Sequence, residues 1–221
     1  MKVIYISGID GCGKSTQAKL LTNNLKNKDI SVEYLWLRWE PSFRRFIHLF
    51  RSKKICRHTQ THLKVSENGE QESWLQYKRK ILHNPIFRKL WLTYACIDYY
   101  ISYRKKWDNI NTDIDIVVID RYIYDFIIDQ AINLDIPPNK TYLLEKKIFL
   151  QKFHHPDLNI IINIPALEGF LRKNDGTSLS YLEKREAYYL ALTGDNTLHI
   201  NGLDTIDNIQ SQILDWVIKR I

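Results

Sequence analysis

The stretch "KVIYISGIDGCGKST" (residues 2–16) determines how the rest of the chain can be interpreted. Residues 2–7 form a short apolar run typical of a buried strand, and the run leads directly into a glycine-rich loop. Apolar residues then recur at helical spacing, at Ala18, Leu21 and Leu25. Between the two elements, Gly8, Gly13, Lys14 and Ser15 satisfy the spacing GxxxxGK[ST]. The pattern predicts a strand, a tight loop and a helix that together hold a phosphate group.

The spacing of this motif has a mechanical reason. Glycines allow the backbone N–H groups of the loop to point inward at phosphate oxygens, and the N-terminus of the following helix adds the positive end of its dipole. Lys14 would then reach the β- and γ-phosphates of ATP, and the Ser15 hydroxyl would bind Mg²⁺. We therefore predict ATP and Mg²⁺ as ligands, with the cofactor-binding residues Gly8, Asp10, Gly11, Cys12, Gly13, Lys14, Ser15 and Thr16.

Further apolar runs alternate with helix-period segments along the chain. Four of them are predicted as buried strands, at 32–37, 115–120, 158–164 and 198–200. Strand and helix alternation is typical of a three-layer α/β domain with a largely parallel sheet, and 221 residues fit a single such domain, 1–221. No apolar run approaches the roughly 20 residues that span a bilayer, and the start of the chain lacks the pattern of a signal peptide. We expect a cytoplasmic protein.

Basic residues are concentrated in one part of the chain. The segment 42–90 holds twelve Lys or Arg residues against three Glu, whereas acids and bases nearly balance elsewhere. This local excess argues against a generally basic nucleic-acid-binding fold, and no specific nucleic acid is expected as a partner. We interpret residues 42–85 as a helical and loop insertion in the domain, whose part 42–57 could make a weak membrane or protein contact.

Several stretches in the same order resemble thymidylate kinases, within the nucleoside monophosphate kinase group of P-loop proteins. These stretches are "GIDGCGKSTQAKLLTNNL", "LRWEP" (37–41), "VVIDRY" (117–122), "IINIPALEGFLRK" followed by "LEKREAYYLAL", and "INGLDTIDNIQSQIL". The resemblance implies a P-loop kinase fold with a five-stranded, mainly parallel sheet, a mobile lid at about 165–182 and a homodimer. It also implies a nucleotide donor and a small phosphorylated acceptor, with the reaction dTMP + ATP to dTDP + ADP.

The resemblance also assigns roles to individual residues. Asp10 would contact the sugar hydroxyl of the acceptor, Arg38 and Arg121 would bind its phosphate, and Asp120 would organise Mg²⁺ through water. Arg172, in the lid with Lys173, would neutralise charge on the transferred phosphoryl group. The predicted catalytic residues are thus Lys14, Asp120, Arg121 and Arg172, and the predicted metal-binding residues are Ser15 and Asp120. From the residues alone, Asp120 and Arg121 could instead form a structural ion pair at the edge of the sheet.

The acceptor side departs from the family pattern. Tyr94 could stack on the acceptor base, but the family's base-reading arginine falls on Ile97 or Asp98 in this sequence. Acids at Asp125 and Asp129 follow the Asp120 motif, where the family has small residues. Two alternatives therefore stay open. One is a kinase for a nucleoside or another small molecule, with Asp120 or Asp125 as base. The other is an ATP-binding switch or adaptor that uses the basic insertion.

Overall fold

The computed structural model describes residues 1–42, 80–148, 153–173 and 177–221, and its centre is a five-stranded sheet. The strand order is β2-β3-β1-β4-β5, and every neighbouring pair is parallel. In chain order the strands are β1 (Lys2–Ser7), β2 (Val32–Trp36), β3 (Ile116–Asp120), β4 (Leu158–Asn163) and β5 (Thr197–Asn201). The order reverses direction at β1, so the loop after β1 lies at the position where open α/β sheets bind ligands.

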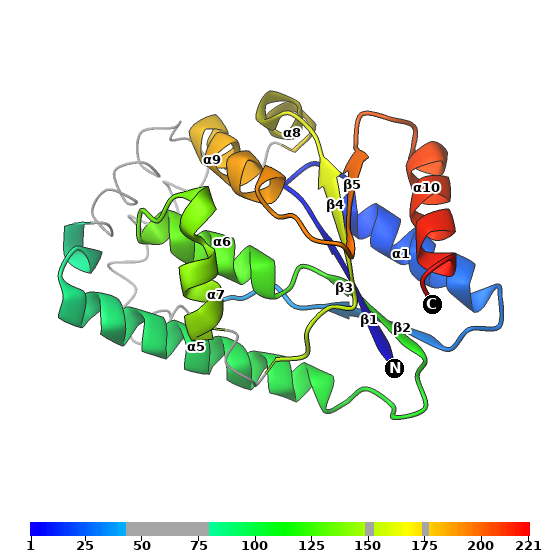
Figure 1. The fold of residues 1–221 in the computed structure, drawn as a ribbon, viewed down its shortest axis with the longest axis horizontal. Coiled ribbons are helices and arrows are strands. Elements are labelled where there is room, and N and C mark those ends of the chain that lie inside the picture. Colours follow the sequence, from blue (N-terminus) through cyan, green and yellow to red (C-terminus); the bar gives the residue numbers. More distant parts are fainter. Residues whose placement is uncertain (43–79, 149–152, 174–176) are drawn as a thin grey trace, which may run out of the picture.

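Helices cover both faces of the sheet. Figure 1 shows α1 and α10 on one side and α5, α6, α7 and α9 on the other, with α8 near the carboxyl ends of β4 and β5. Their bounds are α1 (Lys14–Lys26), α5 (Pro85–Trp107), α6 (Ile123–Asn133), the 3₁₀ turn η1 (Pro138–Lys140), α7 (Tyr142–Ile148), α8 (Ala166–Arg172), α9 (Leu179–Leu190) and α10 (Ile206–Ile218). This is the predicted three-layer α/β/α architecture, with a sheet that is wholly parallel.

The strands form where the chain is continuously apolar. All five residues of β3 are buried, as are five of the six residues of β1, because helices cover both faces. In register, Ile6 of β1 and Trp36 of β2 both lie opposite Asp120 of β3. The carboxyl ends of the three strands therefore meet at one edge of the sheet, where the polar residues that follow them are brought together.

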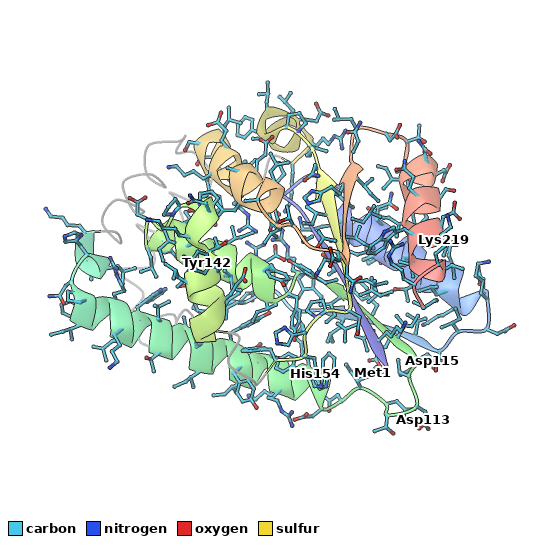
Figure 2. The ribbon with its side chains drawn as sticks, in the orientation of Figure 1. Met1, Asp113, Asp115, Tyr142, His154 and Lys219 are labelled. Carbon is cyan, nitrogen blue, oxygen red and sulfur yellow. The ribbon has the colours of Figure 1, made fainter. Side chains whose placement is uncertain are left out.

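Helix α5 is the longest described element and packs on α6 through aromatic rings. It begins at Pro85, after Asn84 caps its N-terminus by accepting from the N–H of Ile86. The Tyr99 ring stacks on Phe126 of α6 at 4.7 Å between centroids. Nearer its C-terminus, Trp107 stacks on His154 at 4.1 Å, which ties the segment before β4 to the helix. Figure 2 labels His154 close to the C-terminal end of α5.

The sequence predictions of fold class and strand positions are confirmed, with ends that shift by one residue or less. The predicted insertion at 42–85 lies mostly outside the described residues, as does the proposed contact segment 42–57 apart from Ser42. The predicted lid, 165–182, contains α8 and the start of α9, and its residues 174–176 are not described. Among the helices that the structure describes, none has the length and apolar character needed to cross a membrane.

Candidate active site

The glycine-rich loop connects β1 to α1 at the carboxyl edge of the sheet, which is the predicted context of the motif. Gly11 and Gly13 both have positive φ, +88° and +87°, a conformation that residues with a Cβ rarely adopt. Gly13 caps the N-terminus of α1, and a Cβ built on it would meet nothing within 4 Å. Ser15 and Thr16 are exposed in the first turn of the same helix. The loop therefore faces open space at a helix N-terminus, which fits the phosphates of ATP.

Asp10, inside this loop, is the centre of a buried cluster of charges. Its carboxylate pairs with the guanidinium of Arg121, with Lys14 Nζ at 3.6 Å and with Lys173 Nζ at 3.5 Å. Burial alone would raise the pKa of Asp10, but Lys14 and Arg121 hold that pKa well below its usual value. Burial lowers the pKa of Lys14, whose ammonium also donates to the Ile9 carbonyl at 3.0 Å. Three cations from separate parts of the chain thus converge beside the phosphate loop.

Asp120 and Arg121, adjacent in sequence, form their contacts in different directions. Asp120 is fully buried, and its Oδ2 accepts from the Tyr34 hydroxyl at 3.0 Å. Its Oδ1 is buried and has no hydrogen-bond partner among the described residues. A buried carboxylate oxygen without a donor fits a role in organising a magnesium ion through water. Arg121 has φ +64° and pairs instead with Asp10 and Asp125.

A comparison with family models finds no match for this chain. Among curated proteins, the chain is 28% identical to the thymidylate kinase of Desulfotalea psychrophila over 222 residues, which cover 96% of the chain and 92% of that protein. The chain is thymidylate kinase-like. The similarity therefore covers nearly the whole length of both proteins.

In this thymidylate kinase-like chain, the segment after β2 is fastened to α5. The Trp39 indole donates to Asp98 Oδ2 at 2.9 Å, and the same carboxylate accepts from the backbone N–H of Ser42 at 3.1 Å and from its hydroxyl. Asp98, one of the two positions where the family's base-reading arginine would fall, thus holds the segment that carries Arg38. Ile97, the other position, is exposed. The structure therefore gives Asp98 a positioning task.

The two other predicted acceptor-binding residues, Arg38 and Tyr94, are not among the ion-pair partners of Asp10 in the described residues. Arg38 is exposed, and within the described residues it forms no ion pair with Asp10. Tyr94 is half-buried beside Trp91, at 6.1 Å between ring centroids, and Trp91 also meets Trp39 edge to face. Their roles in acceptor binding stay predictions. In the structure, the rings of Trp39, Trp91, Tyr94 and Phe126 form a cluster of aromatic contacts.

The lid segment contacts the phosphate loop directly through α8. A Cβ on Gly169 would lie 2.6 Å from the Asp10 carbonyl oxygen, so only glycine allows this approach of the two backbones. Arg172 points away from the cluster: it donates to Glu168 at 2.7 Å and to the Gly202 carbonyl at 3.1 Å. Lys173, the next residue, reaches Asp10. Of these two residues, Lys173 is therefore the one that contacts the Asp10 cluster, and the catalytic role of Arg172 stays a prediction.

Sequence reasoning missed the residues that surround Asp125. This carboxylate accepts from the Tyr5 and Tyr189 hydroxyls, from the Tyr122 N–H at 3.1 Å and from Arg185 Nη2 at 3.1 Å. Burial, together with the charge of Asp125, raises the pKa of Tyr5 well above its usual value, so the hydroxyl stays protonated and donates. The signal that could have revealed this cluster is the pair of acids, Asp125 and Asp129, on a mostly apolar helix, since buried acids require a basic partner.

Proposed function

We propose that the protein transfers the γ-phosphoryl group of ATP to a nucleoside monophosphate, with dTMP + ATP to dTDP + ADP as the favoured reaction. The observation that carries the proposal is that Lys14, Arg121 and Lys173 converge on Asp10, within and beside the glycine-rich phosphate loop. Two polyanions can approach each other only if cations neutralise the oxygens between them. The similarity to a thymidylate kinase supports the same reaction.

Each part of the site has a task in this proposal. The loop from Gly8 to Thr16 and the buried ammonium of Lys14 bind the phosphates of ATP, while Ser15 and Asp120 hold the magnesium ion directly and through water. Held there, Mg²⁺ would supply positive charge to neutralise the phosphates. Arg121 binds the acceptor phosphate, since a guanidinium contacts two phosphate oxygens at once. Asp10 pairs with these cations, so a phosphate that binds them has to displace part of that pairing.

A nucleoside kinase is the second candidate, and the contacts of Asp125 weigh against one version of it. A general base needs a free lone pair within reach of the acceptor hydroxyl. Asp125 is buried and already accepts from four donors, so it is poorly suited to remove a proton. Asp120, with one oxygen that has no partner among the described residues, keeps that possibility open. An ATP-binding switch is the third alternative, and it predicts no acceptor-dependent turnover.

An acceptor panel tests the proposal directly. Purified protein is mixed with ATP, Mg²⁺ and either dTMP, dUMP, AMP, GMP, CMP or thymidine, and ADP is followed with a coupled assay. We expect acceptor-dependent ADP with dTMP. ADP formed only with thymidine would favour the nucleoside kinase, and none with any acceptor would favour the switch.

Two variants connect this activity to the site. Lys14→Ala should lower kcat about 100-fold or more, because the ammonium acts on charge that develops during transfer. Arg121→Ala should mainly raise the KM for the acceptor. Arg104→Ala is the matched control, since Arg104 forms an exposed ion pair with Asp108 on α5, and its kinetics should stay at wild-type values.

The predicted homodimer and the cytoplasmic location remain part of the proposal. Helix α5 carries a row of exposed apolar side chains, Ile86, Phe87, Leu90, Ile97 and Ile101, which supports an interface along this helix. Sedimentation of wild-type protein and of a Leu90→Glu variant would distinguish a dimer from a monomer. A dimer that persists in the variant would argue against pairing through α5.

A further inference from the structure

An alternating chain of charges runs from the phosphate loop to helix α9. Arg121 pairs with Asp10 and lies with Nη1 at 3.7 Å from Asp125 Oδ1. Arg185 of α9 then donates with one nitrogen to Asp125 at 3.1 Å and with the other to Asp129. The order Asp10, Arg121, Asp125, Arg185, Asp129 therefore connects three acids through two arginines. Four of these residues are buried, and the Asp129 side chain is 29% exposed.

Asp125 contacts the backbone as well as its ion-pair partners in this row of charges. Its Oδ2 accepts from the N–H of Tyr122, the residue after Arg121, which fixes the backbone at the start of α6. Arg121 itself has φ +64°, a conformation that costs free energy in a residue with a Cβ. The Asp125 contact next to it helps to retain this turn. Asp125 thus acts on both the backbone and the guanidinium of Arg121.

Arg185 has a different task, which is to compensate the negative charge of Asp125. Without a counter-ion, Asp125 would be a buried carboxylate that draws Arg121 strongly to itself and repels an arriving phosphate. Arg185, together with the Tyr5 and Tyr189 hydroxyls, compensates the charge of Asp125. Arg121 therefore keeps more of its positive charge for a ligand. The fork of Arg185 also joins Asp125 to Asp129, which a lysine could not do with the same geometry.

We propose that Asp125 and Arg185 are positioning residues that hold the guanidinium of Arg121 in place for the acceptor phosphate. The inference rests on the proposed function, because it assigns Arg121 to the acceptor. It adds two residues that lie outside the phosphate loop: Asp125 of α6, which acts on Arg121 directly, and Arg185 of α9, which acts through Asp125. It also connects the helix that follows the lid to the acceptor side of the site.

The first test measures the hydrogen-exchange rate of the Arg121 side chain in the protein without added substrate. The side-chain nitrogen signals of Arg121 are assigned by their loss in Arg121→Lys, and their hydrogen exchange is measured by NMR. We expect slow exchange in the wild type and exchange at least about tenfold faster in Asp125→Asn, which removes the charge but keeps the shape. Unchanged exchange in this variant would overturn the inference. The exchange measurement does not depend on any reaction, so it tests the positioning of Arg121 even if no acceptor is phosphorylated.

The second test separates acceptor binding from the other steps. Asp125→Asn should raise the KM for the acceptor about tenfold, while the KM for ATP stays within about twofold, since about tenfold corresponds to one lost charged contact. A fall in the acceptor KM would mean that Asp125 competes with the phosphate, and would refute the positioning role. Asp108→Asn, in the exposed pair of the same Arg-to-Asp spacing on α5, is the control.

A third variant covers the case in which Asp125→Asn does not fold. Arg185→Lys keeps the positive charge but can bridge only one of the two acids, so the acceptor KM should rise about threefold with unchanged circular dichroism. Wild-type values for both the acceptor KM and the Arg121 exchange rate would contradict the proposal. If the wild type forms no acceptor-dependent ADP but Arg121 exchange still responds to the variants, the proposed function fails and the positioning of Arg121 stands.

Discussion

Replacing Tyr34 by Phe should weaken magnesium use as well as the fold. Tyr34 of β2 donates to Oδ2 of the fully buried Asp120 at 3.0 Å, and no described residue donates to Oδ1. Burial and the Asp120 charge raise the pKa of Tyr34, so its hydroxyl remains a donor at all ordinary pH values. The variant leaves the carboxylate without a donor among the described residues.

The size of the effect follows from the exposure of the donor. A hydrogen bond to a charged group contributes about 1.5–3 kcal/mol, but Tyr34 is half-buried, so water can partly replace the lost hydroxyl. We expect a loss of about 1–2 kcal/mol in the free energy of unfolding. For a chain of this length, that loss lowers Tm by roughly 2–8 °C. Urea denaturation followed by tryptophan fluorescence measures the first quantity, and calorimetry measures the second.

The kinetic consequence is more specific. If Asp120 organises Mg²⁺ through water, an unfixed carboxylate should raise the Mg²⁺ concentration needed for half-maximal activity about threefold to tenfold, with the acceptor KM unchanged. Tyr188→Phe is the control, because the Tyr188 hydroxyl donates to the Ile136 carbonyl. That variant should lose a similar amount of stability without any change in magnesium dependence. An unaltered magnesium requirement in Tyr34→Phe would refute the role given to Asp120.

Three further predictions concern the lid and the Asp10 cluster. Lys173→Ala should lower kcat about 100-fold, and Arg172→Ala less than about tenfold, in the coupled assay, because only Lys173 reaches Asp10; the reverse order would restore Arg172 as the lid cation. Gly169→Ala should raise the KM for ATP and lower stability by about 1–3 kcal/mol, whereas Gly194→Ala, whose Cβ would come no closer than 3.3 Å to Thr197 Oγ1, should change little in either measurement. Asp10 has a lowered pKa when folded, so its stabilising contribution is complete above the unfolded value near 4 and is lost as pH falls below it. Urea denaturation at pH 5, 4 and 3 should therefore show a smaller loss of stability in Asp10→Asn than in the wild type.

The strands and the phosphate loop could be predicted because their signals are local. A parallel strand buried on both faces requires a continuous apolar run, and "IVVID" and "LNIIIN" supply that run within five or six residues. The loop motif likewise occupies eight consecutive residues, Gly8 to Ser15, with a strand before it and a helix after it. Neither inference needs information about the rest of the chain.

The partners of the charged residues could not be predicted, because they are set by packing between distant elements. Asp10 and Arg121 are 111 residues apart, and Asp125 and Arg185 are 60 residues apart. Arg185 also lies in "LEKREAYY", where an arginine on an amphipathic helix is most simply interpreted as solvent-exposed. Its burial follows only from the way α9 packs over α6. For the same reason, the pairing of Asp98 with Trp39 could not be predicted, because the two residues lie on separate segments of the chain.

The site thus contains its own substitutes for the substrate charges. Asp10 pairs with Lys14, Arg121 and Lys173, which are the cations that the proposal assigns to phosphates. Cations buried without an anion would destabilise the fold, so an internal carboxylate is needed as long as the substrates are absent. That carboxylate must also give way, because binding energy used only to displace it would be lost to catalysis. Asp125, whose own charge is compensated by Arg185, then retains Arg121 in position while the contact between Arg121 and Asp10 exchanges for phosphate.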